Sequence, residues 1–403
     1  MSQVGEADVR DANRVLVFDT TLRDGEQAPG FSMSAADKLA MAFALRDLGV
    51  DVIEAGFAAA SPGDADAIRR VASEVEGPTF CSLARANEAD INTAYGALQS
   101  TPRRRVHIIL GTSPIHRQVK FGMNADEVLE TAVRAVAFAR TLFDDVEFCA
   151  EDAIRTERDF LGDVLEAVCE AGATTLNIPD TVGYSTPLEI GAIFSEMKRR
   201  TARFPHVVLS AHCHNDLGMA VANTLTAVAN GARQVEVAVN GIGERAGNCA
   251  LEEVVMALKT RGDLFGVHTG VDTTKILSTS RLLSKITRSP LVRNKAIVGV
   301  NAFAHEAGIH QAGILADART YEIMRPEDVG FEGSRLVLGK HSGRHAIAQR
   351  AETLGYGLSG AALATVFAEF KRRADTIGEI DDAELVSIIN AVTETAGGMS
   401  ALS

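Results

Sequence analysis

The feature that most constrains how this chain can fold is a strand-then-helix pattern that recurs eight times. Short apolar runs alternate with longer segments whose apolar residues return at helical spacing. The runs lie about 25–40 residues apart, an interval typical of a closed parallel barrel. Eight such units favour an α/β fold, a (β/α)8 TIM barrel, over an open doubly wound sheet. The expected strands are 15–22, 50–57, 79–83, 105–111, 146–151, 174–179, 207–214 and 234–240.

Local signals place the boundaries of helices and domains. Ser34 is a candidate cap for a helix over 34–48, and Gly49 follows its end as in left-handed caps. We expect a small, mostly helical subdomain after the barrel, with helices over 346–354, 359–373 and 381–394. The predicted domains are a flexible N-terminus (1–13), the barrel (14–285), a linker (286–330) and the helical subdomain (331–403).

Composition narrows the choice of partners and compartment. A formal net charge of −13 disfavours nucleic acid and anionic membranes as partners. No apolar stretch reaches the ~18 residues of a membrane span, and the polar N-terminus lacks the apolar core of a secretory signal. The five Cys residues are irregularly spaced, which indicates reduced packing thiols. We therefore expect a cytoplasmic protein.

Reactive residue types gather where the expected strands end. His212 and His214 are two apart, so their rings leave a strand on the same face, and Asp19 and Asp24 end or follow the first strand. Carboxylates and paired imidazoles suit a divalent metal, and spacing alone leaves either acid as the ligand. The competing interpretations are hydrogen-bonded core histidines and a turn aspartate. The arginine run 103–105 precedes a strand, and we expect it to be solvated.

Eight motifs extend this pattern along the chain. Together they resemble the 2-isopropylmalate synthase branch of the metal-dependent, Claisen-type acyltransferases, which share a barrel with 3-hydroxy-3-methylglutaryl-CoA lyase. The resemblance covers about residues 14–395. The motifs are FDTTLRDGEQ (18–27), EAGFAAASPGD (54–64), NIPDTVG (177–183), HCHNDLG (212–218), NGIGERAGN (240–248), GIHQ (308–311), TYEIM (320–324) and LGKHSGR (338–344).

The resemblance implies one divalent metal ion, Mn, Mg or Zn, with a monovalent cation as a further activator. The implied ligands are Asp24, His212, His214 and Asn248, which by analogy selects the second acid of the first motif. Local sequence alone also allows Asn248 to be a loop-capping amide. A 2-oxo acid would chelate the ion, which would act on its ketone as a Lewis acid.

The resemblance also implies roles around the metal. Arg23 would bind substrate and stabilise negative charge as the carbon–carbon bond forms, with Glu244 orienting it. The alternative for Arg23 is a surface ion pair. Thr181 would hydrogen-bond the carboxylate of the oxo acid. Glu151 is one half of an implied acid–base pair, needed because a methyl proton of acetyl-CoA must be removed.

The other half of that pair, His310, lies beyond the barrel with the nearby phenol of Tyr321. In the family this segment covers a neighbouring subunit's active site, so the resemblance implies a homodimer. Without the resemblance, His310 reads as a solvated helix residue. The chain departs from the family pattern here, because Ala304, Ala307 and Ala312 stand where relatives usually carry Ser, Ser and Asp.

The implied reaction is condensation of acetyl-CoA with 3-methyl-2-oxobutanoate to 2-isopropylmalate and CoA, in leucine biosynthesis. The same chemistry on 2-oxoglutarate or pyruvate, as in homocitrate or citramalate synthases, is the nearest alternative. A 3-hydroxyacyl-CoA lyase and a non-catalytic barrel are weaker ones. Full-length relatives usually carry a further leucine-binding regulatory domain, which we expect this chain to lack.

Overall fold

The computed structural model describes the backbone of residues 11–358 and 360–400, which divide into two compact units, 1–291 and 292–403. The first unit is a closed barrel of eight parallel strands, in which β8 pairs with β1 to complete the ring. This confirms the predicted (β/α)8 barrel. The strands are β1 Leu16–Asp19, β2 Val52–Glu54, β3 Thr79–Arg85, β4 Arg104–Gly111, β5 Asp145–Glu151, β6 Thr175–Asp180, β7 Val208–Cys213 and β8 Gln234–Val237.

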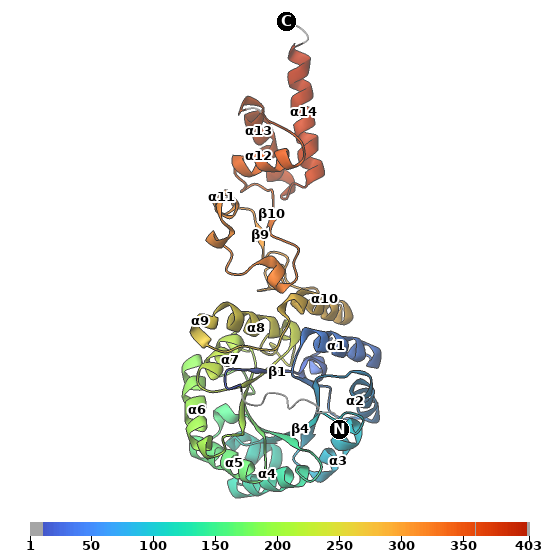
Figure 1. The fold of residues 1–403 in the computed structure, drawn as a ribbon, viewed down its shortest axis with the longest axis vertical. Coiled ribbons are helices and arrows are strands. Elements are labelled where there is room, and N and C mark those ends of the chain that lie inside the picture. The colour runs from blue at the N-terminus through green and yellow to red at the C-terminus, as the bar shows by residue number, and fades with distance from the viewer. Residues whose placement is uncertain (1–10, 359, 401–403) are drawn as a thin grey trace, which may run out of the picture. The chain divides into compact units, whose positions relative to one another are not determined.

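Helices surround the strands as an outer ring (Figure 1). Their termini follow local signals: the Ser34 side chain accepts a hydrogen bond from the Asp37 amide, and Gly49 ends the same helix at φ 86°. Two more helices, α9 Gly262–Phe265 and α10 Ile276–Thr287, follow the ring. The ring helices are α1 Ala35–Leu48, α2 Pro62–Glu74, α3 Glu88–Leu98, α4 Ala125–Ala139, α5 Arg158–Glu170, α6 Pro187–Arg200, α7 Ala220–Ala229 and α8 Leu251–Thr260.

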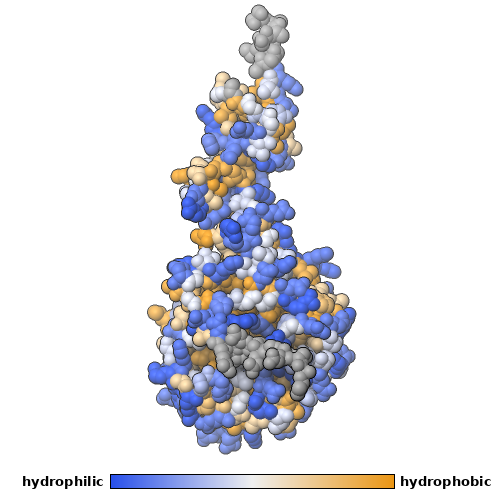
Figure 2. All heavy atoms as spheres, in the orientation of Figure 1, coloured by the Kyte–Doolittle hydropathy of each residue, from blue (hydrophilic) through white to orange (hydrophobic). Residues whose placement is uncertain are grey.

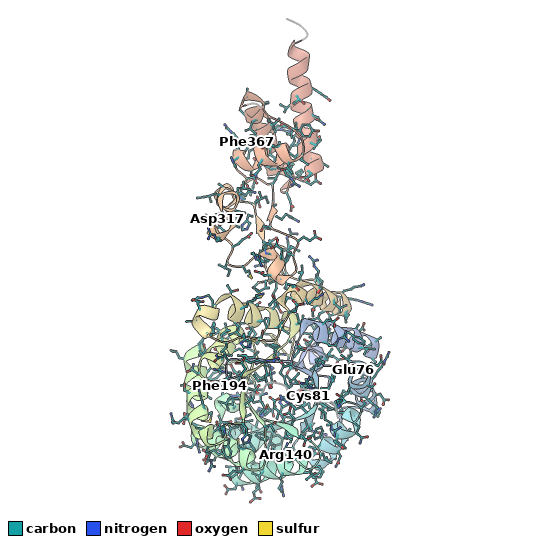
Figure 3. The ribbon with its side chains drawn as sticks, viewed as in Figure 1. Glu76, Cys81, Arg140, Phe194, Asp317 and Phe367 are labelled. Carbon is teal, nitrogen blue, oxygen red and sulfur yellow. The ribbon has the colours of Figure 1, made fainter. Side chains whose placement is uncertain are left out.

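The barrel is packed, because side chains from the strands fill the centre of the ring (Figure 3). Inward-facing strand residues such as Phe18, Glu54 and His107 are at most 1% exposed. On the face seen in Figure 2, polar residues cover most of the outer helices, with apolar residues interspersed among them. This arrangement holds the carboxyl ends of the strands in one rigid rim, where the candidate site lies.

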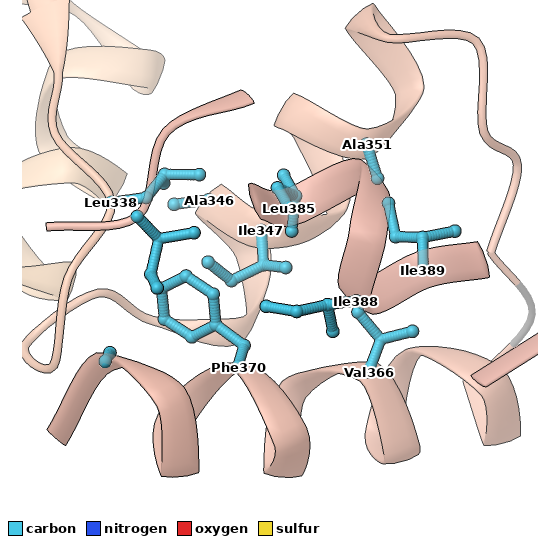
Figure 4. Close-up of a cluster of buried hydrophobic side chains, with 11 residues drawn as sticks. Leu338, Ala346, Ile347, Ala351, Val366, Phe370, Leu385, Ile388 and Ile389 are labelled. Atoms are coloured by element: carbon cyan, nitrogen blue, oxygen red, sulfur yellow. The ribbon is translucent and has the colours of Figure 1, made fainter. Parts of the chain in front are cut away.

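The second unit contains a two-stranded parallel sheet, β9 Ala304–His305 with β10 Arg335–Leu336, and four helices among its described residues. Its core is a separate cluster that includes Ile347, Phe370 and Leu385 (Figure 4). Since this cluster draws on three helices, the unit has an apolar core of its own. The helices are α11 Gly308–Ala316, α12 Arg344–Thr353, α13 Gly360–Ile377 and α14 Asp382–Ser400.

Three details differ from or fall outside the predictions. The last helix, α14, continues to Ser400, beyond the predicted end at 394. Residues 1–10 of the expected flexible N-terminus, and residue 359 of a predicted helix, lie outside the described residues. Residues that follow are fixed to the barrel, since the Asn13 carbonyl accepts a hydrogen bond from the His268 amide (2.9 Å).

No helix in the described part of the chain is both long and apolar enough to cross a membrane.

Candidate metal centre and active site

A short π-helical turn, Thr21–Gly25, follows β1 and carries Arg23 and Asp24. Thr20 starts the turn: its hydroxyl accepts a hydrogen bond from the Asp24 amide (3.3 Å) and donates one to Glu54 Oε2 (2.8 Å). Both Arg23 and Asp24 are buried. The turn is thus tied to the end of β2, which fixes the two side chains at the carboxyl end of the barrel.

Asp24, His212 and His214 form a compact group of potential metal ligands. Asp24 Oδ2 lies 3.9 Å from His212 Nε2 and 3.5 Å from His214 Nε2. Two ligand atoms that each lie about 2.1 Å from one ion are separated by about 3.0–4.2 Å, depending on the angle between them. The separations therefore fit a single divalent ion bound to all three side chains.

Asn248 supplies a fourth candidate ligand atom. Its amide nitrogen donates to Asp24 Oδ1 (3.0 Å) and to the Ile242 carbonyl (3.1 Å). Its amide oxygen is buried and has no hydrogen-bond partner among the described residues. A buried carbonyl-type oxygen without a donor is costly unless something else binds it, and a cation would do so. The residues present therefore fit a metal.

The protonation states also suit metal binding. Burial lowers the pKa of His212 to about 4 and lowers that of His214, so both imidazoles are neutral at pH 7. Burial would by itself raise the pKa of Asp24, but the Arg23 guanidinium and the two imidazoles hold it well below its usual range. An ionised carboxylate and two neutral imidazoles are the forms that bind a cation.

The second ring nitrogens of the two histidines have different partners. His212 Nδ1 lies 2.9 Å from Glu236 Oε2, so it donates to a carboxylate and leaves Nε2 free as a ligand. His214 Nδ1 accepts from Arg245 (2.6 Å), so Nε2 carries the proton of this neutral ring and faces Asp24. Binding a metal through His214 Nε2 would require the tautomer with the proton on Nδ1, so the contact with Arg245 would have to change.

The spacing of the sequence left open whether Asp19 or Asp24 is the acid that faces the two imidazoles, and the contacts of each residue answer this. The Asp19 carboxylate accepts hydrogen bonds from the Thr21 amide (2.9 Å) and hydroxyl (3.0 Å). Complete burial raises its pKa to about 7. Asp19 therefore stabilises the turn, whereas Asp24 faces the two imidazoles.

A layer of buried polar side chains lies inside the barrel and connects to the site. Glu54 accepts from Arg23 Nε (2.6 Å) and lies 2.9 Å from His107 Nδ1. Glu236 bonds Asn177 (2.5 Å) as well as His212. Sequence analysis assigned no role to these residues. The sequence did contain a signal for them: each is a charged or polar residue at an inward-facing position of a strand whose other residues are mostly apolar.

The same layer corrects the expectation for the arginine run 103–105. Arg105 is buried, and its guanidinium binds Asp145 (2.9 Å), Glu147 (2.9 Å) and Gln234 (2.7 Å). The expectation was wrong because the side chain of Arg105 faces the inside of the barrel, where buried acidic and amide side chains bind it. Only Arg103 is exposed, as expected for the whole run.

Three further predicted residues lie on the same rim. The Thr181 hydroxyl accepts a hydrogen bond from the Asp152 amide (2.9 Å). Glu151, the last residue of β5, binds Lys120 through both carboxylate oxygens. Glu244 donates its backbone N–H to Asp24 Oδ1 (3.3 Å), whereas the side chains that hold Arg23 are Glu54 and Asp24. A role for Glu244 in orienting Arg23 stays a prediction.

His310 and Tyr321 lie in the second unit, on α11 and directly after a short helical turn. Their rings are close together, with centroids 4.3 Å apart, and both residues are exposed. The neighbouring Ile309 and Ile323 are 74% and 79% exposed. This part of the unit thus presents an imidazole, a phenol and two apolar side chains on its surface.

Comparisons with known proteins find similar sequences over most of the chain. Residues 14–283 match the HMGL-like family, and residues 297–377 match the family described as homocitrate synthase post-HMGL domain-like. A 2-isopropylmalate synthase from Aquifex aeolicus is 56% identical over 93% of this chain and 72% of its own length. One from Rhodopirellula baltica is 53% identical over 98% of this chain and 76% of its own length.

Solved structures with the same barrel are more distant in sequence. An HMG-CoA lyase from Pseudomonas aeruginosa matches with a TM-score of 0.59 at 20% identity, over 69% of this chain and 94% of that chain. One from Bacillus subtilis matches with a TM-score of 0.58 at 21% identity, over 70% and 96%. At this identity the likeness concerns the fold alone.

Proposed function

The chain belongs to the HMGL-like enzymes and, within them, to the 2-isopropylmalate synthase family, and from that membership we propose that it condenses acetyl-CoA with 3-methyl-2-oxobutanoate. The products are 2-isopropylmalate and CoA, and the reaction belongs to leucine biosynthesis. It is an acyltransferase reaction. The single observation that carries the proposal is the convergence of Asp24, His212 and His214, with the free amide oxygen of Asn248, at the carboxyl end of a barrel.

The cofactor is a divalent metal, and acetyl-CoA is the co-substrate. Asp24, His212, His214 and Asn248 would hold the ion, and Mn, Mg and Zn all accept such mixed oxygen and imidazole ligands. When bound, the ion would supply Lewis-acid polarisation of a ketone. We also propose that a monovalent cation activates the enzyme.

Side chains of the chain itself bind the substrate, stabilise its developing charge and remove the proton. The buried Arg23 guanidinium, held by Glu54 and Asp24, keeps a fixed positive charge where the ketone oxygen gains negative charge. Thr181 binds the carboxylate of the oxo acid. Glu151 removes a methyl proton from acetyl-CoA, so that the carbon can attack the ketone. Water then cleaves the thioester and releases the CoA thiol.

His310 and Tyr321 complete the proposed acid–base machinery, and we propose that they do so across a homodimer. The exposed Ile309 and Ile323 beside them support a contact surface, since apolar residues grouped on a surface favour association. A cytoplasmic location is supported by the five cysteines, because all are buried and none forms a disulfide.

The test is release of free thiol from acetyl-CoA with a panel of 2-oxo acids, with and without a chelator. We expect release with 3-methyl-2-oxobutanoate, abolition by the chelator, and recovery on adding one of the three metals. Faster release with 2-oxoglutarate or pyruvate would instead assign the homocitrate or citramalate reaction. Absence of release with every oxo acid and metal would contradict the proposal.

A further inference from the structure

Two side chains from the loop after β4 converge on Glu151. Gly111, the last residue of β4, pairs in register with Glu151, the last residue of β5, and the Thr112 amide donates to the Glu151 carbonyl (3.0 Å). The chain then forms a short π-helical segment, His116–Phe121. The segment therefore begins close to Glu151, and its side chains can return to the carboxylate.

Lys120 binds the Glu151 carboxylate through both oxygens, at 2.9 and 2.7 Å. The Lys120 side chain is 49% exposed, whereas that of Glu151 is only 14% exposed. An exposed ion pair contributes little to stability, so stability alone gives little reason for this clamp. Its stronger effect is to fix the direction of the carboxylate.

His116, the first residue of the segment, faces the same carboxylate. Its Nδ1 lies 3.4 Å from Glu151 Oε2, and this buried nitrogen has no hydrogen-bond partner within the described part of the chain. Its Nε2 lies 3.8 Å from the carboxylate of Asp152. In the tautomer with the ring proton on Nε2, toward Asp152, a lone pair on Nδ1 faces Glu151.

An ionised Glu151 offers no proton to the Nδ1 lone pair. Once Glu151 has accepted a proton, its O–H can donate to Nδ1. The His116 ring thus lies between the carboxylates of Asp152 and Glu151. Its Nδ1 can accept a hydrogen bond from Glu151 only after a proton has been transferred to Glu151.

We propose that Lys120 and His116 are positioning residues for Glu151 in the removal of the acetyl-CoA methyl proton. The C–H bond breaks, its electron pair stays on the acetyl carbon as an enolate, and the proton forms an O–H bond on Glu151. Lys120 aims the carboxylate before this step, and His116 accepts the new O–H as a hydrogen-bond donor after it. The inference rests on the proposed function, because it assigns partners to the proposed base.

The test measures thiol release by Lys120→Met, His116→Phe and Lys120→Arg, with ordinary and trideuterated acetyl-CoA. Gln118→Met is the matched control, since Gln118 is an exposed residue of the same segment. We expect kcat to fall at least tenfold in Lys120→Met and His116→Phe, with a larger deuterium isotope effect and a KM for the oxo acid within twofold of the wild type. Lys120→Arg should recover most of the loss, and Gln118→Met should behave as the wild type.

Two results would overturn the inference. One is an unchanged kcat and isotope effect in both loss-of-function variants. The other is a reduced rate with no change in isotope effect, which would indicate a merely structural role. Equal metal stoichiometry in all variants shows that the barrel has folded. A wild-type protein that releases no thiol would instead contradict the proposed function, and that outcome differs from an active wild type with unaffected variants.

Discussion

At the scale of single residues, the amide of Asn248 favours a metal site over a cluster of hydrogen-bonded histidines. Its nitrogen is committed to Asp24 and to the Ile242 carbonyl, so its oxygen is the free atom. Elsewhere in the part of the chain that the structure describes, buried amide oxygens without a partner also occur at Asn223 and Gln311, so the free oxygen alone does not identify a metal ligand. What supports a cation here is that the Asn248 amide contacts Asp24, which faces the two imidazoles.

Asn248→Ala should weaken metal binding more than it weakens the fold. We expect the dissociation constant for Mn²⁺, measured by calorimetric titration, to rise at least tenfold, because the variant lacks the amide oxygen and the hydrogen bond that orients Asp24. Asn223→Ala is the control, since Asn223 is a buried amide on α7 outside the ligand group. Equal metal affinity in the two variants would exclude Asn248 as a ligand.

At the scale of secondary-structure elements, α11 lacks a side-chain cap that other helices of the chain possess. Ser34 and Asn124 cap α1 and α4 through their side chains, and each takes part in a capping box. Ala307 occupies the cap position of α11 with an extended backbone, and it provides no side-chain hydrogen bond. One of the alanines that depart from the family pattern therefore has a specific consequence: the first turn of the helix that carries His310 is less stable.

Ala307→Ser should stabilise α11 without new tertiary contacts. A serine cap is worth about 1 kcal/mol, which corresponds to roughly fivefold slower exchange of amide protons that open with the helix. Hydrogen–deuterium exchange of residues 308–316 would measure the change. Ala312→Ser is the control, because it places the same hydroxyl inside the helix, where it cannot cap. Equal exchange in both variants would contradict the capping argument.

At the scale of the whole molecule, a carboxyl group inside the barrel stays protonated at pH values where the same group in the unfolded chain has lost its proton. Burial, together with the nearby charge of Glu236, raises the pKa of Glu147 from 4.5 to about 8. A carboxyl whose pKa is raised on folding stabilises the fold at low pH, and that stabilisation is lost as pH rises from about 4.5 through 8. His212, whose pKa is lowered to about 4, acts in the opposite direction, but only below about pH 6.5.

Between pH 6.5 and 8.0, Glu147→Gln should therefore flatten the pH dependence of stability. Over this interval the wild type should lose roughly 2 kcal/mol more unfolding free energy than the variant, at about 1.4 kcal/mol per pH unit for one retained proton. Urea unfolding of chelator-treated protein, followed by circular dichroism, would measure it. Glu130→Gln, at an exposed position of α4, is the control. Parallel curves for all three proteins would show that Glu147 titrates normally.

Local features of the sequence were enough to predict most of the fold. Gly49 ends α1 in the left-handed conformation, Ser34 caps the same helix, and each of the eight apolar runs became a strand. The same-face spacing of His212 and His214 placed both imidazoles beside one acid. These predictions depend on interactions within a few residues, or on the alternation of side chains along a strand, and both can be read from a linear sequence.

By itself, then, the sequence determined the barrel, the end of the barrel at which reactive residues gather, and the identity of the paired imidazoles. Only the tertiary structure decided that Asp24 rather than Asp19 faces them, that Glu54 holds Arg23, that Arg105 is buried, and that Lys120 and His116 meet Glu151. The physical reason is strand register. Whether a side chain enters the barrel, and which side chain it meets there, depends on how eight separate strands align, and no single stretch of sequence specifies that alignment.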